Sequence, residues 1–171
     1  MDIGKAVAVS NVRNKILFLC TGNYYRSRFA EMWFNHLATT AGLDWVAESR
    51  GLATERNGHL VGPISLATVA ALAALGVALP AEHRAAIACS AGDLQGASHV
   101  VALKEAEHRP LLVERFPGWE GRVQYWHVHD LDGATAAQAL AEIRNLVESL
   151  LFELPRELNG EIHLNRARAG V

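Results

Sequence analysis

Residues 15–27 read KILFLCTGNYYRS, and the rest of the chain can be interpreted outward from them. The first six residues are apolar with β-branched and aromatic members, which predicts a short buried strand. The Gly-Asn pair that follows is a turn signal, and a helical pattern begins near Ser27. A strand, a tight turn and a helix in this order are typical of proteins in which strands and helices alternate.

Apolar periodicity predicts the remaining elements. The first helix runs from Ser27 to Gly42, where glycine stops it. Further strands are expected at 45–49, 98–103 and 122–128, and further helices at 63–76, 104–116 and 140–154. Pro63 is assigned to the first turn of its helix, Pro110 is expected to break the next one, and Pro155 to end the last.

Strands that alternate with helices imply parallel pairing and right-handed crossovers. We therefore expect an α/β fold, a flavodoxin-like doubly wound parallel four-stranded sheet of order 2-1-3-4 with helices on both faces. Ligands bind such sheets at the carboxyl ends of the strands, which is where residues 20–27 fall. We expect a single domain over residues 14–155, with residues 1–13 and 156–171 as terminal extensions.

Composition narrows the function classes. The chain has 171 residues, half of them hydrophobic and a fifth charged, as in an ordinary soluble globular protein. The formal charge of -2 argues against a nucleic-acid partner, which selects for a basic excess. No apolar run approaches the roughly 18 to 20 residues of a membrane span. Two cysteines form no disulfide framework, so the cytoplasm is the expected compartment.

The loop after the first strand has the components of an anion site. The backbone N–H groups of a tight turn and the positive end of a helix converge there. Arg26 adds a guanidinium fork for two phosphate oxygens, and Ser27 can donate to the sulfur of Cys20. This positive field favours the Cys20 thiolate, the nucleophile that in-line displacement at phosphorus requires. The expected phosphate-binding residues are Thr21, Gly22, Asn23, Tyr24, Tyr25, Arg26 and Ser27.

The alternative for Cys20 is a buried structural thiol that ends a strand. The other cysteine provides a comparison, because Cys89 is followed by a polar turn and has Gln95, not arginine, six residues later. Cys89 therefore lacks the surroundings that make Cys20 a candidate nucleophile.

The segment FLCTGNYYRSRFAE, residues 18–31, resembles the signature of the low-molecular-weight protein tyrosine phosphatases. ESRGL at 48–52, His83-Arg84-Ala85 and SHVVALKEAE at 98–107 resemble further segments of that family. The resemblance covers about residues 14–154. It implies a cofactor-independent and metal-independent phosphomonoesterase that works through a phosphocysteine intermediate.

The resemblance also implies that Asp130 is the general acid. Asp130 follows the fourth strand, so it is expected at the same sheet edge as Cys20, where a carboxylic acid is a suitable proton donor. Asp132 is the alternative general acid, although Asp132 is better suited to cap the helix that begins near Thr135. His83 could either pack in its loop or support the phosphate loop.

The chain departs from the family at several positions. Tyr25 stands where a second cysteine is often found, so a vicinal disulfide is impossible. Arg28 and Leu131 each replace a proline, and the aromatic pair that often follows the acid is missing. Tyr24 could provide an aromatic wall instead. His127 and His129 with Asp130 resemble metal ligands, but a fourth ligand is not apparent and no metal is expected.

Several functions remain open at this point. The first is a protein tyrosine phosphatase whose substrate is a phosphorylated protein or a small aryl phosphate and whose product is inorganic phosphate. Thr21, directly after the nucleophile, also occurs in relatives that act on phosphoarginine. A thiol-dependent arsenate reductase and a phosphate-binding module are further alternatives.

Overall fold

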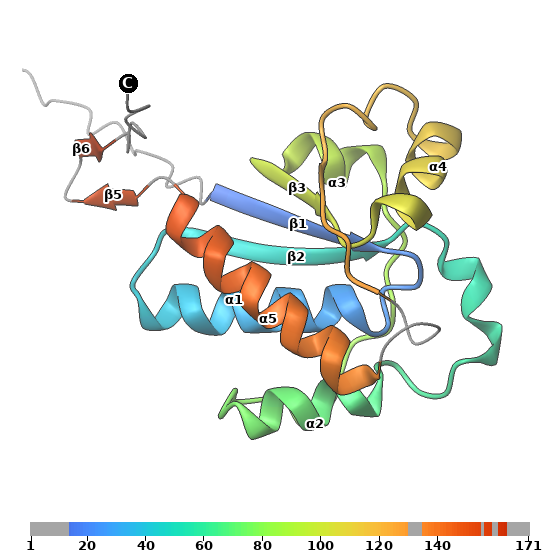
Figure 1. Cartoon of the computed structure of the whole chain (residues 1–171), viewed down its shortest axis with the longest axis horizontal. Coiled ribbons are helices and arrows are strands. Elements are labelled where there is room, and N and C mark those ends of the chain that lie inside the picture. Colours follow the sequence, from blue (N-terminus) through green and yellow to red (C-terminus); the bar gives the residue numbers. More distant parts are fainter. Residues whose placement is uncertain (1–13, 130–134, 155, 159–160, 164–171) are drawn as a thin grey trace, which may run out of the picture.

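Four parallel strands in the order β2-β1-β3-β4 form the centre of the computed structural model (Figure 1). The structure describes residues 14–129, 135–154, 156–158 and 161–163. The elements, in chain order, are β1 (Asn14–Cys20), α1 (Arg26–Thr40), β2 (Trp45–Gly51), the 3-10 helix η1 (Thr54–His59), α2 (Leu66–Ala74), α3 (Ala91–Gly96), β3 (His99–Ala102), α4 (Glu105–Arg115), β4 (Gln124–Tyr125), α5 (Ala136–Glu153), β5 (Arg156–Leu158) and β6 (Glu161–His163).

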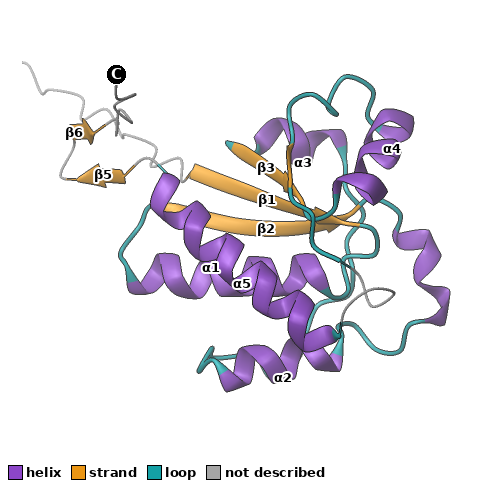
Figure 2. Cartoon of the chain, in the orientation of Figure 1, coloured by secondary structure: helices purple, strands orange, loops and turns teal. Residues whose placement is uncertain are grey.

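Helices cover both faces of the sheet, as Figure 2 shows, and β1 explains why. Ile16 and Phe18 belong to a core that includes residues of α1, α2 and α5. Leu17 and Leu19 belong to a second core with residues of α3 and α4. All four side chains are fully buried, so a central strand of this kind is apolar on both faces. The predicted fold class and strand order are confirmed.

The second predicted helix begins later than expected. It starts at Leu66, with Ser65 as its N-cap, and Pro63 lies outside it. The preceding segment is tied to the loop after β1, since Tyr24 Oη donates to the Val61 carbonyl and Ser65 N–H donates to the Tyr24 carbonyl. The predicted end is confirmed, because Gly76 follows the helix with a φ of 77°.

The break predicted at Pro110 is wrong, because α4 is continuous and contains this proline. A proline in a helix removes one backbone donor and crowds the preceding turn. Here the helix is retained because His108, Leu111 and Leu112 are buried against the sheet. Tertiary burial therefore outweighs the local preference.

The fourth strand is shorter than predicted. Only Gln124 and Tyr125 pair regularly with β3. The chain then continues through single hydrogen bonds, from Trp126 N–H to the Ala102 carbonyl and from Val128 N–H to the Leu103 carbonyl. The sequence did not predict η1, α3 or the antiparallel pair β5 and β6, which are too short to show periodicity.

The cap of α5 also differs from the expectation. Thr135, not Asp132, is the N-cap, and it forms a capping box with Gln138. The predicted capping role of Asp132 is therefore wrong. Asp132 itself lies outside the described residues.

Candidate active site

A cleft of about 350 Å³ opens at the carboxyl end of β1. One side is the phosphate loop, residues 20–27. The other side is the segment between β2 and α2, which arches past this end of the sheet (Figure 1); we call residues 54–65 the outer wall. The lining residues are Cys20, Thr21, Gly22, Tyr24, Tyr25, Arg26, Arg56, Asn57, His59, Leu60 and Ser65.

Cys20 is the last residue of β1, and hydrogen-bond donors surround its sulfur. Asn23 N–H donates to Sγ at 3.2 Å, and Ser27 Oγ lies 2.9 Å from Sγ. The Asn23 amide donates to Ser27 Oγ at 2.9 Å, which leaves the hydroxyl proton of Ser27 for the sulfur. The side chain is 3% exposed, so the sulfur is approached only through the cleft.

Asn23 holds the loop in shape. Its φ of 52° is in the left-handed region, which Asn tolerates better than most residues. The fully buried side chain donates to Ser27 and Ser49 and accepts from Arg84 and the Ile87 N–H. All four bonds are 2.8–3.0 Å long, so the amide uses its full hydrogen-bonding capacity.

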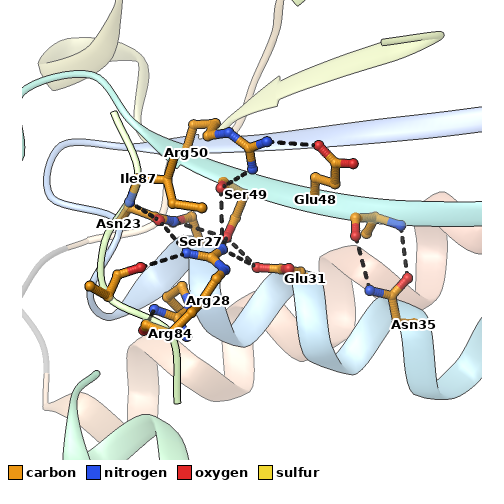
Figure 3. Close-up of polar contacts among 12 residues, drawn as sticks. Asn23, Ser27, Arg28, Glu31, Asn35, Glu48, Ser49, Arg50, Arg84 and Ile87 are labelled. Atoms are coloured by element: carbon orange, nitrogen blue, oxygen red, sulfur yellow. Dashed lines mark hydrogen bonds and ion pairs between the residues drawn. The ribbon is translucent and has the colours of Figure 1, made fainter. Parts of the chain in front are cut away.

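Arg84 connects this loop to the rest of the fold (Figure 3). It donates to Asn23 Oδ1 at 2.9 Å and to Ser49 Oγ at 3.0 Å, and it pairs with Glu31 at 2.8 Å. The sequence singled out the neighbouring His83 as the possible support. No hydrogen bond from His83 to the loop is found among the described residues, and Arg84 has this role.

Arg26 begins α1 and is 4% exposed. Its guanidinium donates to the Glu107 carboxylate at 2.8 Å, and Lys104 pairs with the other oxygen of that carboxylate at 2.9 Å. Burial alone would raise the pKa of Glu107, but the hydrogen bonds from Arg26 and Lys104 lower it to about 2. Glu107 thus stays ionised as an anchor for Arg26, and this contribution is lost only as the pH falls through about 2.

His108 lies beside this ion pair and stays neutral. Burial, and after it the positive charge of Arg26, lowers the pKa of His108 from 6.5 to about 3. Its Nδ1 accepts from the Lys104 N–H at 3.0 Å, so the ring proton is on Nε2. A neutral ring here leaves Glu107 as the electrostatic partner of Arg26.

Arg28, two residues after Arg26, is fully buried and does not line the cleft. It donates to the carbonyls of Pro63 and Arg84 at 3.3 and 3.0 Å. Burial lowers its pKa, and the charge of Arg84 adds to that effect. Arg28 therefore joins α1 to the outer wall and to the segment that carries Arg84.

The outer wall is held against the phosphate loop. Asn57 Nδ2 donates to the Gly22 carbonyl at 2.7 Å. A Cβ on Gly22 would lie 2.4 Å from Asn57 Oδ1, so any other residue here would displace the Asn57 side chain from this hydrogen bond. On the far side, Arg115 donates to the Leu52 carbonyl and pairs with Glu55.

The structure brings most of the predicted site together. Thr21, Gly22, Tyr24, Tyr25 and Arg26 line the cleft with Cys20, whereas Asn23 and Ser27 support the loop from behind. Asp130, the predicted acid, lies outside the described residues. The lining residues that sequence reasoning missed are Arg56, Asn57, His59, Leu60 and Ser65, together with the supports Arg84 and Glu107.

The described residues contain neither a metal-ligand cluster nor a membrane-spanning helix. In that part of the chain, no three His, Cys, Asp or Glu residues are grouped closely enough to hold a metal ion. None of its helices is long and apolar enough to cross a membrane.

Comparison with known proteins agrees with this geometry. A low-molecular-weight protein tyrosine phosphatase from T. tengcongensis is 28% identical, with a TM-score of 0.69 over 82% of this chain and 99% of that one. YfkJ from Bacillus subtilis is 25% identical, with a TM-score of 0.67 over 81% and 92%. The YwlE arginine phosphatase from Geobacillus stearothermophilus, at 23% identity, has the same fold, with a TM-score of 0.62 over 80% and 90%.

No curated protein sequence matches the chain significantly. The model of the family "Low molecular weight phosphotyrosine protein phosphatase", however, matches residues 15–164, which is most of the sequence. The chain belongs to this family and is a phosphatase.

Proposed function

We propose that the chain is a protein tyrosine phosphatase that hydrolyses phosphomonoesters through a phosphocysteine intermediate on Cys20. The observation that carries this proposal is the position of the sulfur. Cys20 Sγ accepts from Asn23 N–H and lies 2.9 Å from Ser27 Oγ, at the base of a cleft that Arg26 also lines.

The proposed reaction has two displacements at phosphorus. The Cys20 thiolate forms the S–P bond while the P–O bond to the tyrosyl oxygen breaks and Asp130 gives that oxygen its proton. Water, deprotonated by the same carboxylate, then attacks phosphorus and breaks the S–P bond. Inorganic phosphate leaves, and the thiolate and the acid are regenerated. Backbone N–H groups of the loop and the fixed Arg26 stabilise the charge that develops on the equatorial oxygens.

Turnover of p-nitrophenyl phosphate tests the mechanism. We expect hydrolysis without added metal, inhibition by vanadate, and loss of turnover in Cys20→Ser with phosphate binding retained. Mass spectrometry of rapidly quenched wild-type protein should detect one added phosphoryl group on the peptide that contains Cys20. Retained turnover in Cys20→Ser would reject the proposal.

A protein arginine phosphatase is the second candidate, because Thr21 directly follows the nucleophile and lines the cleft. Phosphoarginine keeps a guanidinium, which needs a carboxylate partner. The described lining residues include two arginines, Arg26 and Arg56, and no carboxylate. Asp130, the proposed acid, would supply a carboxylate for either substrate, so the preference for phosphotyrosine rests on the family, whose description names phosphotyrosine. Comparing kcat/KM for a phosphotyrosyl and a phosphoarginyl peptide of one sequence separates the two substrates.

The remaining alternatives have less support. A thiol-dependent arsenate reductase needs a second reactive thiol, but burial raises the pKa of Cys89 to about 12, with the Asp93 charge acting in the same direction. A phosphate-binding module has no need of the donors placed around Cys20. We also place the activity in the cytoplasm, because Cys20 and Cys89 are both free and the nucleophile must stay reduced. The net charge of -2 supports a protein or aryl phosphate substrate over a nucleic acid.

A further inference from the structure

The outer wall carries an arginine that has no partner within the described part of the chain. Arg56 is exposed and lines the cleft opposite the phosphate loop. Among the described residues, no hydrogen bond or ion pair involves its guanidinium. Arg26, by contrast, is tied to Glu107. Arg56 thus lines the cleft with no described partner that would compete with a ligand for its charge.

The carboxylate nearest to Arg56 in the sequence, that of Glu55, is already paired with another arginine. Glu55 pairs with Arg115, and the hydrogen bond from Arg115 is the main cause that lowers the pKa of Glu55 to about 2. Arg115 also holds the Leu52 carbonyl at 2.6 Å, which fixes the start of the outer wall. This arrangement turns Glu55 toward α4 and leaves Arg56 on the cleft side of the same turn.

His59, one turn after Arg56, also lines the cleft and is exposed. Its ring can donate a hydrogen bond to an anion. Between these two residues, Asn57 donates to the Gly22 carbonyl at 2.7 Å, which holds the backbone that carries both of them beside the phosphate loop.

The cleft is larger than a phosphate group. Its volume of about 350 Å³ is in the range of pockets that enclose whole small ligands. The aromatic residues Tyr24 and Tyr25 and the apolar Leu60 can flank the ring of a phosphotyrosine. Arg56 and His59 then face what lies next to that ring in the substrate.

We propose that Arg56 and His59 form a second anion subsite that binds a carboxylate side chain close to the phosphotyrosine of a peptide substrate. The proposal rests on the proposed tyrosine phosphatase activity and specifies its substrate class, an acidic phosphotyrosyl peptide. Since both groups are exposed, the subsite acts by charge attraction in water and is screened by salt.

Two matched peptides test the proposal. One has glutamates on both sides of the phosphotyrosine, and the other has glutamines at the same positions. The readout is the ratio of kcat/KM for the acidic peptide to that for the neutral peptide, measured with the same enzyme. Any general loss of folding or turnover in a variant cancels in this ratio.

For the wild type we expect a ratio of roughly two- to fivefold per engaged charge, the range of exposed ion pairs. The effect should appear in KM, and 0.5 M salt should bring the ratio close to one. Arg56→Gln should lower the ratio toward one, Arg56→Glu should invert it, and His59→Gln should lower it less. Arg144→Gln, an exposed arginine on α5 that does not line this cleft, is the matched control and should keep the wild-type ratio.

The outcomes separate the two proposals. Hydrolysis of both peptides with a ratio near one in the wild type would overturn the subsite and leave the proposed activity standing. Equal ratios in the wild type and Arg56→Glu would also overturn the subsite. No turnover of either peptide or of p-nitrophenyl phosphate would overturn the activity, and the subsite with it.

Discussion

The two sides of the cleft are built differently. The phosphate loop is buried or half-buried and tied to segments distant in sequence: Asn23 alone makes four side-chain hydrogen bonds, and Arg26 has a carboxylate anchor on α4. The outer wall is largely exposed, and hydrogen bonds to only two loop residues hold it: Asn57 donates to the Gly22 carbonyl, while Tyr24 bonds to Val61 and Ser65 among the described residues. The difference indicates that the chemistry needs a fixed loop, whereas substrate choice can be placed on a more lightly held segment.

The largest expected effect is the loss of rate when the proposed general acid, Asp130, is replaced. Asp130→Asn should lower the rate with phenyl phosphate by about 10²–10⁴-fold, because a basic leaving oxygen depends on protonation. The loss should be smaller with p-nitrophenyl phosphate. The measurement is kcat/KM for both esters across a pH series.

Asp132→Asn is the matched control for Asp130. Because Thr135 caps α5, this variant should keep both its rate and its melting temperature. If Asp132→Asn were the slow variant, Asp132 would be the acid and the alignment of this loop would be shifted by two residues.

The next effect is the loss of stability when Asn23, which holds the phosphate loop in shape, is replaced. Asn23→Ala leaves the buried Ser27 and Ser49 hydroxyls and the Ile87 N–H without their Asn23 partner, at a positive φ, so it should lower the unfolding free energy by about 2–4 kcal/mol. Urea denaturation provides the measurement. Asn23→Gly separates the causes, since glycine accepts the backbone angle; equal stability in both variants would show that the lost hydrogen bonds dominate.

Lowering the pH should destabilise the fold through His108, which lies beside the ion pair of Arg26 and Glu107. Its pKa is about 3 in the fold against 6.5 unperturbed, so the unfolded chain binds the extra proton between these values. The unfolding free energy should therefore fall with decreasing pH from 6.5, by up to about 1.4 kcal/mol per pH unit. His108→Leu should remove this slope between pH 6.5 and 5, whereas His127→Gln, at an exposed residue, should retain it. An unchanged slope in His108→Leu would assign the acid sensitivity to other groups.

The smallest effect belongs to the outer wall. Asn57→Ala removes the one bond to Gly22 and should lower the unfolding free energy by about 1 kcal/mol. KM for a phosphotyrosyl peptide should rise severalfold, with kcat much less affected, because the wall positions substrate more than it contacts phosphorus. A loss of stability as large as that of Asn23→Ala would remove the distinction between the two sides of the cleft.

The fold and the phosphate loop were predictable because their signals are local. The apolar run of β1, the Gly-Asn turn and the start of α1 are adjacent, and a central parallel strand is apolar on both faces. The predictions based on Pro63 and Pro110 were wrong because tertiary contacts outweighed the local preference of proline. For Pro63 the contact is the hydrogen bond from Tyr24 to Val61, and for Pro110 it is the burial of Leu112.

The supports of the site could not be predicted in the same way. Arg84 and Glu107 lie 61 and 81 residues from the loop residues they bind, and although both lie in segments that resemble the family, no local pattern assigns either side chain to the loop. Arg56 and His59 belong to a short 3-10 helix without periodicity. For the segment 83–85, the sequence directed attention to the histidine, and the geometry shows that its neighbour is the contact.

The ion pair between Arg26 and Glu107 has a consequence for the protein during its synthesis. A ribosome adds roughly 5–20 residues per second, and the N-terminal part emerges first. The 81 residues between these partners take about 4–16 s to translate at that rate. During this interval the nascent chain already has Cys20 and the whole phosphate loop but lacks the carboxylate that anchors its arginine. The phosphate loop therefore gains the anchor of its arginine only seconds after the proposed nucleophile has been added to the chain.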